Sequence, residues 1–148
     1  MTNGESEEIL GIFPGYNKNF SKTKNKLFFT TNRLIVQQEK HMIPLRGDTP
    51  GRPEYISTIA NTRERLKMKQ ISPDPILKSN PENYEIHYSD IAAVELKSAR
   101  FGRYTCYELF LFTAENLDAP KYDIGIGVGE EHIKYVQEFF HNIWPDKM

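Results

Sequence analysis

The sequence predicts one α+β domain in which antiparallel strands are followed by a single helix that closes the core. Six short β-rich runs alternate with turn residues, and the spacing of apolar residues then changes to three and four near residue 133. The chain has 148 residues, of which 39% are hydrophobic, and this suits a single core. We therefore expect residues 1–148 to fold as one domain.

The predicted strands are rich in β-branched and aromatic residues and are bounded by turn residues. They are residues 8–13, 26–30, 33–38, 91–96, 104–112 and 121–126. Pro14-Gly15 is expected to end the first strand, and Thr31-Asn32 to join the second and third in a hairpin. His87 is expected to be a strand residue rather than a proton carrier, and Cys106 a small buried side chain within its strand.

The last element is predicted to be an amphipathic helix, because Ile133, Val136, Phe140 and Ile143 recur at helical spacing. Pro145 stands where this helix should end. Its apolar face has to be buried, which is achieved if the helix packs on the open end of the strands.

Residues 39–83 are too many for an ordinary loop, and they contain six prolines, so they predict an insertion between strands. Its middle, residues 55–70, predicts a short basic amphipathic helix. A secondary basic patch would consist of Arg63, Arg65, Lys67 and Lys69. Three readings stay open for this segment: a helix packed on the sheet with solvated charges, an element facing a partner or membrane, and partial disorder.

Two segments resemble a known family. Residues 27–36 (LFFTTNRLIV) resemble the strand-turn-strand signature of GRAM and prokaryotic pleckstrin-homology-like domains, and residues 88–94 (YSDIAAV) resemble their second signature. The resemblance implies a bent antiparallel β-barrel of about six or seven strands, capped by a C-terminal helix. Insertion 39–83 is longer than the family pattern normally has. Arg33, inside the first signature, is expected to pair with a neighbouring strand rather than with a ligand.

The net charge of -1 conceals a segregation along the chain: residues 1–16 carry -3, residues 17–80 carry +8 and residues 81–148 carry -6. The best candidate for an anionic-ligand site consists of Lys18, Lys22, Lys24 and Lys26. Lipid-binding members of the family place a basic loop here, so the resemblance implies a phosphorylated headgroup as ligand. The alternative is a solvated loop that only adds solubility.

Catalysis, metal binding and a cofactor are not expected. The four histidines, His41, His87, His132 and His141, are scattered, and Cys106 has no neighbouring base. The run from Gly125 to Gly129 lacks the last glycine of a dinucleotide-binding loop. A pI near 6.4 argues against a nucleic-acid partner, and the absence of a signal peptide or apolar span predicts a cytoplasmic protein.

The sequence therefore predicts a non-catalytic binding module with a protein or peptide partner. An exposed strand edge could accept an extended peptide or a second copy of the chain, since backbone pairing leaves no sequence motif. The alternative is a peripheral module whose loop 18–26 meets an anionic membrane surface or a phosphorylated ligand.

Overall fold

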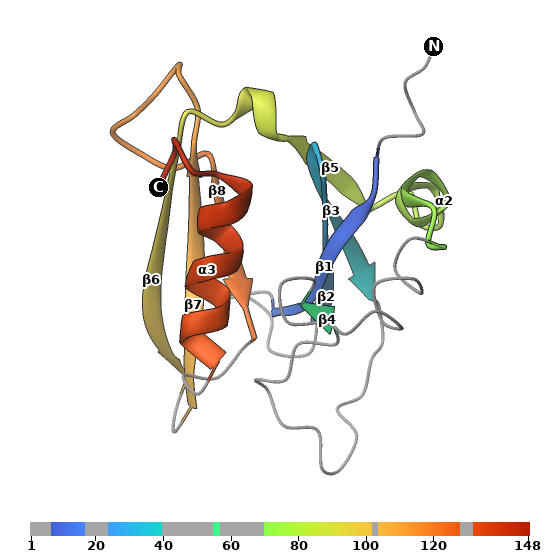
Figure 1. Ribbon diagram of the computed structural model, residues 1–148, viewed down its shortest axis with the longest axis horizontal. Helices are drawn as coiled ribbons and strands as arrows, with labels where there is room; N and C mark the ends of the chain where they lie inside the picture. The colour runs from blue at the N-terminus through green and yellow to red at the C-terminus, as the bar shows by residue number, and fades with distance from the viewer. Residues whose placement is uncertain (1–6, 17–23, 40–54, 57–69, 102–103, 128–131) are drawn as a thin grey trace.

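The computed structural model describes residues 7–16, 24–39, 55–56, 70–101, 104–127 and 132–148 (Figure 1). Its strands form one antiparallel sheet in the order β5-β3-β2-β1-β8-β7-β6, and β4 pairs with β1 beside this path. The strands are β1 (Ile9–Tyr16), β2 (Lys24–Thr30), β3 (Arg33–Glu39), β4 (Tyr55–Ile56), β5 (Tyr84–His87), β6 (Ala93–Phe101), β7 (Tyr104–Phe112) and β8 (Tyr122–Ile126). A C-terminal helix, α3 (Ile133–Ile143), packs on β6, β7 and β8. The predicted α+β arrangement is confirmed at this level.

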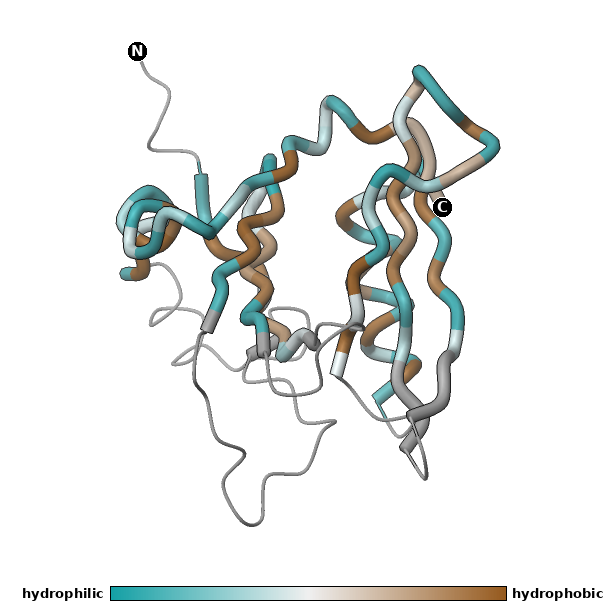
Figure 2. The backbone as a smooth tube through the Cα atoms, turned by 180° about the vertical axis from the view of Figure 1, so that it is seen from behind, coloured by the Kyte–Doolittle hydropathy of each residue, from teal (hydrophilic) through white to brown (hydrophobic). Residues whose placement is uncertain are grey.

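The sheet is open, so the closed barrel that the resemblance implied is not what the described strands form. Its end strands, β5 and β6, are not paired with each other; a 3-10 turn, η2 (Tyr88–Asp90), leads from one towards the other. Among the described strands, the two halves of the sheet are paired where β1 meets β8, at Gly15 with Ile126 and Tyr16 with Gly125 (Figures 1 and 2). Side chains of the main core also join the two halves, and a cavity remains between β5 and the turn after β7.

Several predicted boundaries agree with the structure. β7 covers the predicted residues 104–112, the β2–β3 hairpin turns at Thr31-Asn32, and α3 ends at Ile143, before Pro145. The turn expected at Pro14-Gly15 is wrong, because β1 continues to Tyr16. Pro14 lacks an amide hydrogen, but its carbonyl accepts a hydrogen bond from Gly127 at 2.8 Å, and pairing with β2 continues past it.

β6 also runs further than predicted, since its pairing with β7 continues to Phe101 opposite Tyr104.

In the insertion, Tyr55–Ile56 form strand β4 instead of opening a helix, and residues 57–69 lie outside the described ranges. A helix that the sequence did not predict, α2 (Pro73–Lys78), has a proline in its first turn, where the missing amide costs nothing. His87 lies in β5, as expected.

The main core lies between the sheet and α3. It is built on five rings that pack at centroid distances of 5.0 to 6.1 Å: Phe13, Phe29, Phe139, Phe140 and Trp144. Phe140 and Val136 are fully buried, so the apolar stripe of α3 is covered as predicted. Figure 2 shows hydrophobic residues along both halves of the sheet and along α3.

A second apolar cluster lies on the other face of the sheet. Ile9, Ile12, Phe28 and Ile35 are buried there, and Ile76 and Leu77 of α2 pack against them. Successive strand residues point to opposite faces, so a strand covered on both sides needs uninterrupted apolar residues. This explains the runs at 27–29 and 34–36, and it gives α2 its structural role as the cover of that face.

Among the helices within the described ranges, none combines the length and the apolar character that crossing a lipid bilayer requires.

Candidate functional site

The predicted anionic-ligand site lies mostly where the structure gives no description. Lys18 and Lys22 fall outside the described residues, as do all four residues of the secondary basic patch, Arg63, Arg65, Lys67 and Lys69. Lys24 and Lys26 belong to β2, where they pair with Glu39 and Gln37 of β3. Lys26 is half-buried, and the side chain of Lys24 lies outside the described parts. The binding role of these lysines stays a prediction.

Arg33, at the start of β3, joins three distant carboxylates. Its Nε and Nη2 donate to Glu7 at 2.7 and 3.0 Å, its Nη1 donates to Glu85 of β5 at 2.9 Å, and its Nη2 also donates to Asp74 of α2 at 2.6 Å. The expectation that Arg33 pairs with a neighbouring strand is confirmed. Its guanidinium thereby ties β3, β5, α2 and the segment before β1 together, and four of its five N–H donors bind these carboxylates.

The electrostatics of this cluster follow from burial and pairing. Burial lowers the pKa of Arg33, but hydrogen bonds to Glu7, Asp74 and Glu85 outweigh it and raise the pKa above its ordinary value. The hydrogen bond from Arg33, together with its charge, holds the pKa of Asp74 below the usual range. His87 Nε2 lies 2.9 Å from Glu85 Oε1 at the edge of the group. All three carboxylates contact the single guanidinium of Arg33, so the cluster is a structural clasp that joins distant segments of the chain.

The outer edge of β6 has the geometry of an interface. β6 is an end strand of nine residues whose neighbour among the described strands is β7, whereas β5, at the other end, has four residues. The amide of Val94 donates to the carbonyl of Lys147 at 2.8 Å and so points away from β7. Backbone amides alternate between the two sides of a strand, so those of Leu96 and Ser98 point outward as well.

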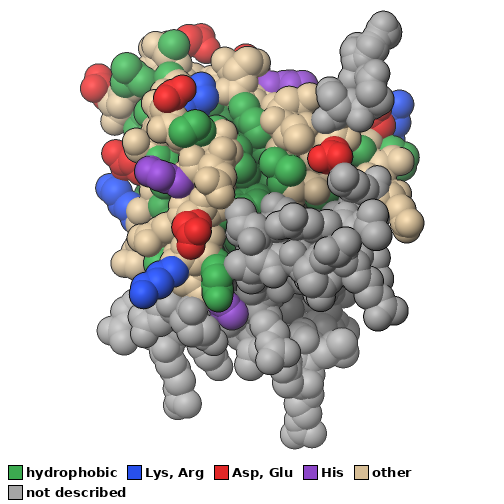
Figure 3. Space-filling view, in the orientation of Figure 1, with side chains coloured by type: hydrophobic (Ala, Val, Ile, Leu, Met, Phe, Trp, Pro, Cys, Tyr) green, Lys and Arg blue, Asp and Glu red, His purple; other side chains and the backbone are tan. Residues whose placement is uncertain are grey.

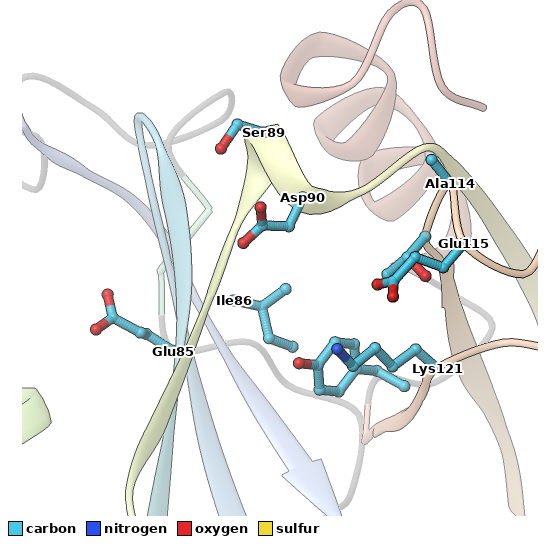
Figure 4. Close-up of a pocket in the computed structure, with 9 residues that line it drawn as sticks. Glu85, Ile86, Ser89, Asp90, Ala114, Glu115 and Lys121 are labelled. Atoms are coloured by element: carbon cyan, nitrogen blue, oxygen red, sulfur yellow. The ribbon is translucent and has the colours of Figure 1, made fainter.

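A cavity of about 440 Å³ opens between β5, η2 and the turn that joins β7 to β8 (Figure 4). Its lining residues are Glu85, Ile86, Ser89, Asp90, Thr113, Ala114, Glu115, Lys121 and Tyr122. Figure 4 shows Asp90 and Glu115 reaching into it from opposite sides, and Lys121 extending towards Ile86, whereas the carboxylate of Glu85 points away across β5. On the face in Figure 3, hydrophobic side chains show in the middle, between the two halves of the molecule.

Besides Glu85, the charged side chains that line the cavity are Asp90, Glu115 and Lys121. Within the part of the chain that the structure describes, no ion pair involves Asp90, Glu115 or Lys121. Lys121 Nζ stands 5.7 Å from the centre of the Tyr122 ring, at cation–π distance. Tyr84 stacks on Tyr122 at 6.4 Å across the gap between the halves, and burial, followed by the charge of Tyr122, raises its pKa.

In the described ranges, no group of three or more His, Cys, Asp or Glu side chains lies close enough together to hold a metal ion. His132 and His141 lie at the two ends of α3, and His41 and the side chain of Cys106 are not among the described parts. Comparisons of the chain with protein-family models, with curated proteins and with solved structures gave no match.

Sequence reasoning missed both the clasp partners and the cavity. Glu7, Asp74 and Glu85 stand 26, 41 and 52 residues from Arg33, and no local pattern connects them. The cavity residues come from two segments, 85–90 and 113–122, that only the fold brings together. The one available signal was Arg33 itself, because a charged residue between two apolar runs has to find partners once those runs are buried.

Proposed function

We propose that this chain is a non-catalytic binding module that takes up an extended strand of a protein partner along the outer edge of β6. The observation that carries the proposal is an end strand of nine residues whose amides at Leu96 and Ser98 point away from the sheet. A strand added there would form backbone hydrogen bonds without any dedicated motif in either chain.

The contact between Val94 and Lys147 supports this use of the edge. Lys147 belongs to the segment after α3, and its carbonyl accepts the Val94 amide at 2.8 Å while its ammonium donates to the Ile91 carbonyl at 2.7 Å. A backbone segment of the chain itself therefore already pairs at one end of the edge. The partner strand would continue from there towards Ser98.

Charge on the edge restricts which strand can bind. Glu95 and Lys97 are exposed neighbours on one face of β6, 3.5 Å apart. Charged residues on an end strand oppose unselective edge-to-edge pairing. A partner that places a basic residue opposite Glu95 and an acidic one opposite Lys97 gains from both cross-strand pairs, and the reverse order is disfavoured.

The architecture supports the resemblance to GRAM and pleckstrin-homology-like domains. Seven strands in one antiparallel path and a C-terminal helix that covers the core are compatible with such a domain, although the sheet stays open. We extend the proposal to this identity: the chain is a pleckstrin-homology-like domain with an unusually long insertion at residues 39–83. Folds of this kind serve unrelated functions, so the edge geometry, and not the fold, supports the binding role.

The test is a selection of peptides from a random library displayed on phage, with the full chain as bait. Selected peptides are then measured against Ser98→Pro, which removes one outward amide without removing a bond to β7, and against Ser98→Ala, which keeps that amide. We expect Ser98→Ala to bind like wild type and Ser98→Pro to lose at least about tenfold in affinity. Unfolding midpoints of both variants check that they fold.

A second arm reverses the charges with the double variant Glu95→Lys/Lys97→Glu. Peptides selected on it should carry the opposite order of acidic and basic residues from those selected on wild type. The proposal fails if no peptide is recovered. It also fails if the recovered peptides bind Ser98→Pro as tightly as Ser98→Ala, or if bound peptide leaves the amides of Leu96 and Ser98 unprotected from hydrogen exchange.

A further inference from the structure

We propose that the strand taken up along the outer edge of β6 belongs to a second copy of this chain, and that the two β6 strands pair antiparallel about a two-fold axis at Leu96. The inference rests on the proposed function, because it names the partner of the same edge. A two-fold pair uses one patch twice, so that patch has to be complementary to itself.

The order of charges on β6 is self-complementary about Leu96. Glu95 and Lys97 stand on either side of it, both are exposed, and their charged atoms lie 3.5 Å apart. Pairing about Leu96 places Glu95 of each copy opposite Lys97 of the other, and opposite charges at facing positions stabilise a sheet. Pairing about Glu95 or about Lys97 would place two like charges opposite each other, which is disfavoured. Charge therefore selects the register centred on Leu96.

The backbone of β6 fits the same register. The amides of Leu96 and Ser98 point outward, as that of Val94 does, whereas those of Glu95 and Lys97 point towards β7. The two copies of Leu96 would exchange two hydrogen bonds, and each Ser98 amide would donate to the Val94 carbonyl of the other copy. Glu95 and Lys97 then form non-hydrogen-bonded pairs, in which facing side chains come closest.

Lys147 marks the position of one partner carbonyl. In this register Ser98 of the second copy lies opposite Val94, whose amide now binds the Lys147 carbonyl at 2.8 Å. The Ser98 carbonyl takes that place, so the Val94 amide keeps one hydrogen bond. The segment that gives way follows α3, and its residues Asp146 and Met148 are exposed.

Leu96 gains an apolar contact at the axis. It is half-buried and packs against the main core from β6, the outermost strand of the half that carries α3 (Figures 1 and 2). The same residue of the second copy would lie directly opposite and cover its remaining exposed surface. A short edge contact of this kind is a small interface, so we expect a dimer with a dissociation constant on the order of 0.1 mM.

The experiment is sedimentation equilibrium of the full chain between about 10 µM and about 1 mM. Wild type should shift from monomer to dimer over this range. Glu95→Lys and Lys97→Glu should each weaken self-association at least about tenfold, because every facing pair then carries like charges. An equimolar mixture of these two variants should form a heterodimer, since all its facing pairs carry opposite charges. The double variant Glu95→Lys/Lys97→Glu should dimerise like wild type.

Controls for net charge are Glu138→Lys and Lys134→Glu, which make the same changes at exposed positions on α3 and should dimerise like wild type. Unfolding midpoints check that each variant folds. The proposal is overturned if wild type stays monomeric at about 1 mM, or if either single variant dimerises like wild type. It is also overturned if the mixture forms no heterodimer.

Peptide selection on wild type tests the edge itself, which keeps the two failures distinguishable. Selected peptides that bind a chain with no self-association would overturn the second copy as partner and leave the proposed function standing. A dimer that Ser98→Pro forms as readily as wild type would overturn it too, because the copies would then meet on another surface.

Discussion

The hydroxyl of Tyr88 donates a hydrogen bond of 2.7 Å to the backbone carbonyl of Thr30, 58 residues earlier in the chain. Tyr88 begins the turn between β5 and β6, Thr30 ends β2, and the Tyr88 ring also packs edge-on against Trp144 at 5.3 Å. One buried side chain thus connects the open end of the sheet, the β2–β3 hairpin and the segment after α3. Burial, and then the charge of Glu7, raises the pKa of Tyr88 above the ordinary tyrosine value.

Tyr88→Phe should lower the free energy of unfolding by about 1–2 kcal/mol at neutral pH, because the Thr30 carbonyl loses a buried donor. The raised pKa also predicts a pH dependence. The folded state holds the phenol proton more tightly than the unfolded state, so stability is complete below about pH 10 and falls as pH rises through the folded pKa. Urea unfolding across this range should show a shallower fall in Tyr88→Phe. Some fall remains, since the pKa of Tyr84 is raised as well. Equal slopes in both proteins would contradict the role given to Tyr88.

Asp74→Asn should lower the free energy of unfolding at neutral pH, because it weakens the interaction with Arg33. In acid it should leave that free energy unchanged. The pKa of Asp74 is lowered by its hydrogen bond from Arg33, so the stability that its charge contributes is present above the unfolded aspartate pKa of about 3.9. That contribution is lost as pH falls through the folded pKa. The difference in unfolding free energy between wild type and Asp74→Asn should therefore be constant near neutral pH and disappear in acid. A difference that persists at the lowest pH would show that the carboxylate charge is not the cause.

Gly11→Ala should destabilise the protein by about 1–3 kcal/mol, because α3 packs too closely for a methyl group. A Cβ added at Gly11 would lie 2.7 Å from the ring of Phe139, which is 1% exposed and cannot move aside. Gly127→Ala is the matched control, since its Cβ would meet no atom closer than the Pro14 carbonyl oxygen at 3.5 Å. Gly127→Ala should unfold at the same midpoint as wild type, or its free energy of unfolding should rise by up to about 1 kcal/mol. Thermal unfolding compares the two, and equal midpoints would contradict the close packing of α3 on β1.

The lysine loop is tested by changing Lys22, Lys24 and Lys26 together to glutamine. If the loop binds an anionic membrane, each lysine contributes about 1 kcal/mol, so sedimentation with vesicles containing phosphatidylserine should fall sharply. The control changes three exposed lysines elsewhere, Lys78, Lys97 and Lys134, and should sediment like wild type. Raising the salt concentration should weaken wild-type binding in the same way. Equal sedimentation of wild type and both variants would leave the loop with a solubilising role only.

Local patterns were enough to predict most of the elements. The apolar, aromatic-rich run 104–112 predicted β7 to the residue, and the spacing from Ile133 to Ile143 predicted α3 together with the burial of Phe140. These two signals are local because the spacing of the apolar residues within each element follows the face that it buries. Pro14-Gly15 misled the prediction, because backbone pairing on both sides of β1 outweighs the turn preference of two residues.

Local sequence patterns were sufficient for a strand-rich α+β chain with a closing helix and an arginine that needed partners. Packing between distant segments leaves the sheet open between β5 and β6, covers its second face with α2, and brings segments 85–90 and 113–122 to one cavity. The two kinds of feature differ in how far apart in the chain the interacting residues lie. Periodicity reports which face of an element is buried, whereas the partners of Arg33 and the walls of the cavity are set by how distant elements pack, which no local pattern records.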